Sequence, residues 1–146
     1  MKKKGAVAVA ALALADWLTK LLCVRLLPSG GVSLIKGVMR LELVYNTGTA
    51  FSILADKPAA ALLLSGCVLF ALTAYTFAAR LTKHEFFPLC GVLAGGIANF
   101  VDRLRDGMVT DMLMTEFISF PVFNLADVCI TVGCAWFAIA CLAGKH

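Results

Sequence analysis

The stretch AAALLLSGCVLFALTAYTFAA occupies residues 59–79 and contains no charged side chain. A helix needs about 20 consecutive apolar residues to cross the hydrocarbon core of a bilayer, so this stretch predicts a transmembrane helix. Pro58 precedes it and Arg80 follows it. Three further apolar segments follow the same pattern, at residues 5–27, 86–101 and 124–144. The sequence therefore predicts a membrane α-helical protein with four transmembrane helices.

The composition supports one integral membrane domain over residues 1–146. The chain is 61% hydrophobic with a mean hydropathy of +0.91, whereas soluble domains are about half apolar. A net charge of +4 spread along the chain suits anionic lipid head groups, and we expect no nucleic-acid partner. Six cysteines stand singly in apolar runs, without the spacing of a metal site. We expect neither a metal nor another cofactor.

The N-terminus has features of a cleavable signal peptide. Residues 1–4 are basic and an Ala13-Leu14-Ala15 site follows the first apolar residues. The apolar run continues beyond that site through Leu27, however, which is long enough to span a bilayer. We therefore expect an uncleaved first helix.

Two connecting segments are long enough to carry structure of their own. Residues 39–45 alternate apolar and polar side chains and predict a strand, and residues 50–54 are a possible second strand. We expect a small extracytoplasmic β-element over about 31–56. Residues 102–123 mix charges with methionine and phenylalanine, which predicts a short interfacial helix.

The topology follows from the helix count and the charges. Four spans place both termini and the 80–85 loop on one side of the membrane. Basic residues are tied between the two sides, but they are denser on the side of the termini. The positive-inside rule then favours cytoplasmic termini, with both long segments facing outward.

Five aspartates lie in or beside the apolar segments, where a carboxylate costs roughly 2.5 to 3.5 kcal/mol to insert. Asp16 lies four residues before Lys20, so the two can pair on one helix face. Asp102 is followed by Arg103 and Arg105, which predicts a structural ion pair near a helix end. Asp106 resembles a solvated loop acid.

Asp111 and Asp127 have no adjacent basic residue. Both acids are expected at the same membrane face, and desolvation among its apolar neighbours should raise the pKa of Asp111. Such a pair can share a proton, so that one carboxylate activates water while the other donates a proton. The two histidines lie at the predicted cytoplasmic ends, which leaves no serine–histidine or cysteine–histidine site on the outer side.

Two other classes of function remain open at this point. A proton- or ion-coupled transporter also uses intramembrane carboxylates, but it predicts polar residues along a path through both leaflets. A membrane scaffold could pair its aspartates with basic residues of a partner, and it predicts no activity alone.

Five motifs in order resemble those of bacterial lipoprotein signal peptidase, also called signal peptidase II. They are DWLTK (16–20), VYNTGTAFS (44–52), GGIANFVDRL (95–104), VTD (109–111) and FPVFNLAD (120–127). The resemblance covers the whole chain and includes four spans. It implies a metal-free membrane aspartic endopeptidase that cleaves prolipoproteins before a diacylglyceryl-modified cysteine.

The resemblance also implies roles for individual residues. It assigns the catalytic pair to Asp111 and Asp127, with Asp102 as the main rival for Asp111. The supporting or substrate-binding residues are Asn46, Gly48, Asn99, Asp102, Arg103, Asn124, Asp16 and Lys20. The implied partners are the prolipoprotein signal peptide, its diacylglyceryl cysteine and membrane lipid. We expect a monomer in the bacterial cytoplasmic (inner) membrane, with its site facing outward.

Overall fold

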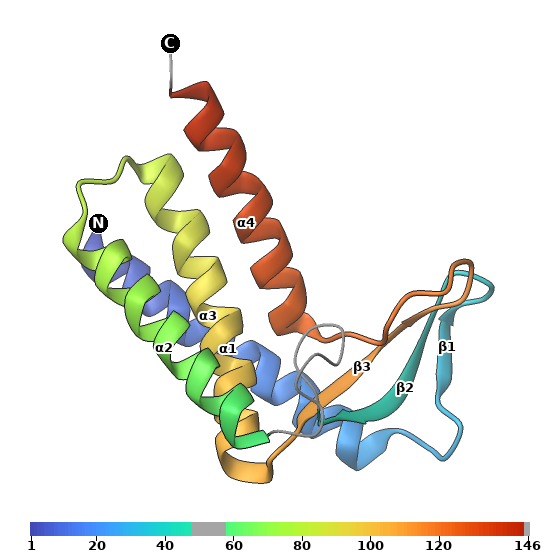
Figure 1. Ribbon diagram of the computed structural model, residues 1–146. Helices are drawn as coiled ribbons and strands as arrows, with labels where there is room; N and C mark the ends of the chain where they lie inside the picture. The colour runs from blue at the N-terminus through green and yellow to red at the C-terminus, as the bar shows by residue number, and fades with distance from the viewer. Residues whose placement is uncertain (48–57, 145–146) are drawn as a thin grey trace.

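The computed structural model describes residues 1–47 and 58–144 (Figure 1). These parts contain four helices that are long and apolar enough to cross a membrane. Their bounds are α1 Lys2–Leu26, α2 Pro58–Ala78, α3 Lys83–Asp106 and α4 Leu125–Ala143. Three strands lie between them, β1 Val32–Ile35, β2 Met39–Asn46 and β3 Val109–Thr115. The four predicted spans are thus confirmed, with bounds shifted by a few residues.

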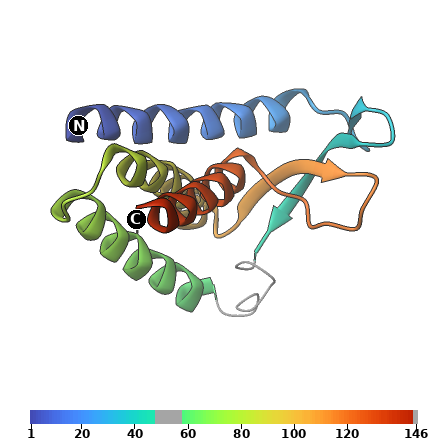
Figure 2. The same cartoon turned by 90° about the horizontal axis from the view of Figure 1, so that it is seen from above.

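Helix α3 is the centre of the helical layer. It contacts α1, α2 and α4, and Figure 2 shows α1 and α2 on opposite sides of the α3–α4 pair. Half of the most apolar stretch of α3 is buried, against 11% in each of the other three helices. Helices α1, α2 and α4 therefore expose most of their apolar surface, as lipid-facing helices do.

Small residues allow α3 and α4 to lie close together. A Cβ at Gly95 would collide with the backbone oxygen of Ala126, and one at Gly133 would lie 2.7 Å from the oxygen of Pro88. Glycines at such contacts let helix backbones approach in a membrane. This close approach brings the N-terminal turn of α4 against the polar end of α3.

Helix α3 is longer than the predicted span of 86–101. Thr82 and Glu85 form a capping box at its start, and Gly107 ends it in the left-handed conformation with φ of 72°. The helix continues through the charged residues at both ends of the apolar run, because the caps and not the apolar run set its bounds. Asp102 consequently lies inside the helix, one turn before its end.

The strands form one antiparallel sheet in the order β1-β2-β3. The predicted strand at 39–45 is confirmed as the central strand β2. Residues 48–57, which include Gly48 and the possible strand at 50–54, lie outside the described residues. The sheet extends from the end of the helical layer opposite to the two termini (Figure 1).

The prediction of a helix within 102–123 is wrong for the segment that forms β3. Val109 and Asp111 are buried, and β3 pairs with β2 in a register that places Val44 opposite Asp111. The hydrogen-bonding edge of β2 lies far away in sequence, so local composition did not reveal this pairing. Residues after β3 return along it, with Leu113 and Phe123 exchanging backbone hydrogen bonds.

Candidate active site

A buried ion cluster joins α1 to α3. The Nζ of Lys20 lies 2.6 Å from Oδ2 of Asp16 and 2.8 Å from Oδ2 of Asp102. The first contact confirms the predicted pairing along α1. The second gives Asp102 a partner on another helix that the sequence did not suggest. The other oxygen of Asp16 accepts a hydrogen bond of 2.8 Å from the backbone N–H of Ala126, in the first turn of α4.

Asn99 connects this cluster to α4. Its Oδ1 accepts hydrogen bonds from Nζ of Lys20 and from Nδ2 of Asn124, each at 3.1 Å. Its Nδ2 donates to Oδ1 of Asp127 at 2.8 Å. Asn99 is one turn before Asp102 on α3, so both residues lie on the same face of that helix. This face contacts Lys20 through both side chains and reaches Asp127 through the Asn99 amide.

Asp127 occupies the first turn of α4 in a capping box with Asn124. The Asn124 side chain accepts from the backbone N–H of Asp127 at 2.9 Å, and the backbone N–H of Asn124 donates to Oδ2 of Asp127 at 3.1 Å. Both oxygens of Asp127 are therefore held by N–H donors.

Asp111 lies on β3 and is only 2% exposed. Asn46 on β2 donates to its Oδ2 at 3.1 Å, and Asn124 donates to its Oδ1 at 2.7 Å. Burial raises the pKa of Asp111 to about 6, and the charge of Asp127 adds to the effect. The two amide donors and the charge of Lys20 oppose that rise.

One side chain links the two carboxylates. Asn124 is fully buried, donates to Asp111 and caps the turn that contains Asp127. Asp111 and Asp127 come from different elements, and Asn124 fixes their relative position.

A groove of about 770 Å³ opens at this pair. Its walls are apolar side chains of α2 and α4, including Leu64, Val68, Leu69, Leu72, Val128, Ile130 and Val132. The polar residues at its end near β3 include Asn46, Asn99, Arg103, Asp111 and Asp127. The groove can hold an apolar ligand while presenting a short polar segment of it to the carboxylates.

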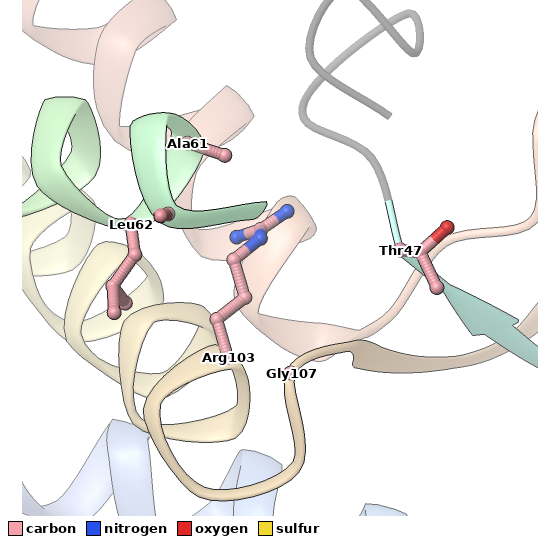
Figure 3. Close-up of a pocket in the computed structure, with 6 residues that line it drawn as sticks. Thr47, Ala61, Leu62, Arg103 and Gly107 are labelled. Atoms are coloured by element: carbon pink, nitrogen blue, oxygen red, sulfur yellow. The ribbon is translucent and has the colours of Figure 1, made fainter. Parts of the chain in front are cut away.

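Arg103 lies at the junction of this groove with a smaller cavity of about 140 Å³. Figure 3 shows its guanidinium directed between the start of α2, marked by Ala61 and Leu62, and Thr47 after β2. Asp111 and Asp127 are both within electrostatic range of Arg103. The arginine that sequence reasoning placed with Asp102 therefore also acts on the carboxylates of the groove.

The structure brings together all the predicted site residues that it describes: Asp16, Lys20, Asn46, Asn99, Asp102, Arg103, Asp111, Asn124 and Asp127. Asp106 is separate, half-exposed and bonded to Arg105 at 2.5 Å. Sequence reasoning missed the apolar walls of the groove, since no pattern distinguishes them from other membrane-facing residues. It also missed the link from Lys20 to Asn99, which lie 79 positions apart.

Comparison with known proteins identifies the family. The family model described as signal peptidase (SPase) II matches residues 8–143. This chain belongs to the signal peptidase II family. It is 38% identical over 151 aligned positions to a lipoprotein signal peptidase of Streptococcus pneumoniae, covering 97% of this chain and 95% of that protein. It is 36% identical over 109 positions to the lipoprotein signal peptidase of Lactococcus lactis, covering 75% and 73%.

A solved structure of a bacterial membrane enzyme, determined by the in meso method at 2.3 Å resolution, has the same fold. It superposes with a TM-score of 0.89 at 24% identity, covering 99% of this chain and 92% of that chain. The signal peptidase II chain is thus a multi-pass bacterial membrane peptidase, and the predicted family is confirmed. The transporter alternative finds no support in these relatives.

Proposed function

We propose that this chain is an aspartic endopeptidase in which Asp111 and Asp127 are the catalytic pair. The observation that carries the proposal is the bridge through Asn124, which holds the buried Asp111 and the half-buried Asp127 together at the polar end of an apolar groove. A shared-proton pair of this kind can act as acid and base without a metal ion.

The surroundings of the two carboxylates divide their roles. Both carboxylates accept N–H donors on both oxygens, but Asp127 is only partly buried, in the first turn of α4. Asp111 is buried on a strand, and its pKa is raised to about 6. Asp127 is therefore the general base and Asp111 the general acid.

The reaction then needs only these two groups and water. Asp127 takes a proton from a water molecule whose oxygen attacks the scissile carbonyl carbon, while Asp111 gives its proton to the carbonyl oxygen. In the resulting gem-diol, the proton on Asp127 moves to the amide nitrogen. One hydroxyl returns its proton to Asp111 as the C–N bond breaks, which restores both carboxyl groups.

The substrate that fits is the signal peptide of a prolipoprotein with a diacylglyceryl-modified cysteine. The apolar walls of α2 and α4 suit a peptide and acyl chains that come from lipid. A signal helix must unwind before it can be cleaved, and its freed backbone groups then need partners. Asn46 and Arg103 line the groove and can supply hydrogen bonds to them.

The proposed orientation places the carboxylate pair at the outer face of the cytoplasmic membrane. Both termini lie at the end of the helical layer opposite to the sheet (Figure 1), and residues 2–4 at that end are lysines. The positive-inside rule assigns this end to the cytoplasm. The sheet, Asp111 and Asp127 then face outward, in a chain that functions as a monomer.

A cleavage assay with purified protein tests this function. The substrate is a prolipoprotein with the diacylglyceryl group, and the same prolipoprotein without it is the matched control. We expect cleavage directly before the lipidated cysteine, identified by mass spectrometry, and little cleavage of the unmodified chain. Equal cleavage of both substrates, or cleavage at another bond, would refute the proposed substrate. Loss of activity with EDTA would refute the metal-free mechanism.

A further inference from the structure

We propose that Lys20 is a positioning residue whose ammonium orients and polarises the Asn99 amide, so that this amide donates to Asp127 and holds the pair in its working state. The inference rests on the proposed function of Asp111 and Asp127. Lys20 itself bonds to neither carboxylate through the contacts described above; it acts through Asn99.

The direction of the hydrogen bonds follows from the chemistry of Lys20. An ammonium group has three donors and no acceptor, so only an oxygen can face it. The oxygen of Asn99 lies 3.1 Å from Nζ of Lys20, which turns the Asn99 nitrogen toward Asp127 at 2.8 Å. An amide in the reverse orientation would place its NH₂ group against the ammonium and its oxygen against a carboxylate.

The same order continues through Asn124. The oxygen of Asn99 also accepts from Nδ2 of Asn124, and that nitrogen donates to Asp111. The oxygen of Asn124 accepts from the backbone N–H of Asp127. Each bond in this chain strengthens its neighbours, since hydrogen-bonded groups polarise one another. Both carboxylates therefore receive donors whose direction agrees with the charge on Lys20.

Lys20 is held in place by groups that do not belong to the groove. Asp16 and Asp102 fix the ammonium at 2.6 and 2.8 Å, and Asp16 also bonds to the first turn of α4. The side chain of Lys20 is only 5% exposed. Lys20 thus keeps its position without contact with the substrate.

Four elements contribute the charged groups near the pair: Lys20 and Asp16 from α1, Asp102 and Arg103 from α3, Asp111 from β3, and Asp127 from α4. N–H donors and positive charge stabilise ionised carboxylates. The charge of Lys20 opposes the rise in the pKa of Asp111, so removal of Lys20 should raise the pKa of that carboxyl further. The bell-shaped pH profile of kcat/KM, which needs one proton on the pair, should move to higher pH.

The test compares two variants that differ only at position 20. Asp102→Asn retains Lys20, whereas Lys20→Met/Asp102→Asn removes it without leaving two unpaired carboxylates. Cleavage of the diacylglyceryl-modified prolipoprotein is measured across pH. We expect the pH profile of kcat/KM of the double variant to lie about one pH unit above that of Asp102→Asn. This is the effect of losing roughly one charge-assisted hydrogen bond. The activity ratio of double to single variant should thus rise at least about tenfold from the acid to the basic limb.

Two controls separate positioning from stability. Lys20→Arg keeps a donor-only cation, so its bell should stay in place even if its activity is lower. Phe86 is buried near the start of α3, far from the carboxylate pair, and its ring contacts Phe77 of α2. Phe86→Leu removes part of that contact, so it should lower Tm without shifting the pH profile of kcat/KM. If Lys20→Met/Asp102→Asn does not fold, Lys20→Gln/Asp102→Asn takes its place, since glutamine retains a hydrogen bond to Asp16.

A double variant that lowers activity by the same factor at every pH would overturn the inference and leave Lys20 a structural residue only. An unchanged profile would overturn it too. Asp111→Asn and Asp127→Asn belong in the same assay. If either remains active, the assignment of the catalytic pair fails; if both are inactive and the bell does not move, only the role of Lys20 fails.

Discussion

Two pairs of carboxylates lie within one hydrogen-bonded network, and they differ in the groups that hold them. Asp16 and Asp102 share the ammonium of Lys20. Asp111 and Asp127 are held by amide and backbone N–H groups, and within residues 1–47 and 58–144 no ion pair of either is found. A bonded cation commits a carboxylate to one charge state, whereas neutral donors leave it able to exchange a proton. The difference separates structural from catalytic carboxylates in the same site.

The largest expected effect is on catalysis, from substitutions of Asp111 and Asp127. Asp127→Asn removes the general base but keeps an oxygen for the cap of α4, so the protein should remain folded. We expect kcat to fall by about 10³-fold or more, the scale of general acid–base catalysis. Steady-state kinetics on the purified variant measure this loss. A variant with near-normal kcat would place the base elsewhere.

For Asp16 and Asp102, which share Lys20, the main effect of a substitution should be on stability. Lys20→Met leaves Asp16 and Asp102 buried without their cation, which should lower the free energy of unfolding by about 3 to 5 kcal/mol. Denaturant unfolding in detergent, followed by the fluorescence of Trp17 and Trp136, measures the change. A variant as stable as the parent would show that the cluster does not support the fold.

Asp111 should make stability depend on pH in a direction that identifies it. Its folded pKa of about 6 lies above the ordinary value of 3.8, so the folded state binds the proton more tightly than the unfolded state. Its contribution to stability is therefore fully present below about pH 4 and is lost as pH rises through 6.

The difference in unfolding free energy between the parent and Asp111→Asn should fall by about 3 kcal/mol over that interval, from the two pKa values. Unfolding curves of both proteins at pH 4 and pH 7 give this quantity. A difference that stays constant with pH, or grows as pH rises, would contradict the raised pKa.

The smallest expected effect is at Asp106, which resembles the other aspartates only in sequence. It is half-exposed and bonded to the neighbouring Arg105, and exposed pairs contribute little to stability. Asp106→Asn should leave both kcat/KM and Tm unchanged within error. A clear loss of activity would mean that the groove extends to the end of α3.

Much of the fold could be predicted because the signals were local. The uncharged run of α2 needed only its composition, and the alternation in β2 needed only its own residues. The ends of α3 and the strand β3 were missed because each depends on distant partners or caps. β3 becomes a strand by pairing with β2, whose residues lie more than sixty positions earlier in the chain.

The candidate site followed from the same kind of reasoning, with the same limits. Asp111 and Asp127 stand out in the sequence because no basic residue is adjacent to either, and in the structure both accept hydrogen bonds from neutral donors. The partner of Asp102 could not be found, since Lys20 is on another helix. The Asn124 bridge between Asp111 and Asp127 could not be predicted either, because it forms only when α4 packs against α3 and β3.

The most direct test of the central comparison sets Asp102→Asn beside Asp111→Asn in one cleavage assay. Both substitutions replace one buried carboxyl group with an amide, and each protein is assayed at an equal folded concentration. We predict that Asp111→Asn loses at least about 10³-fold in kcat/KM, while Asp102→Asn remains within about tenfold of the parent. A folded but inactive Asp102→Asn together with an active Asp111→Asn would contradict the account and move the catalytic acid to the group bonded to Lys20.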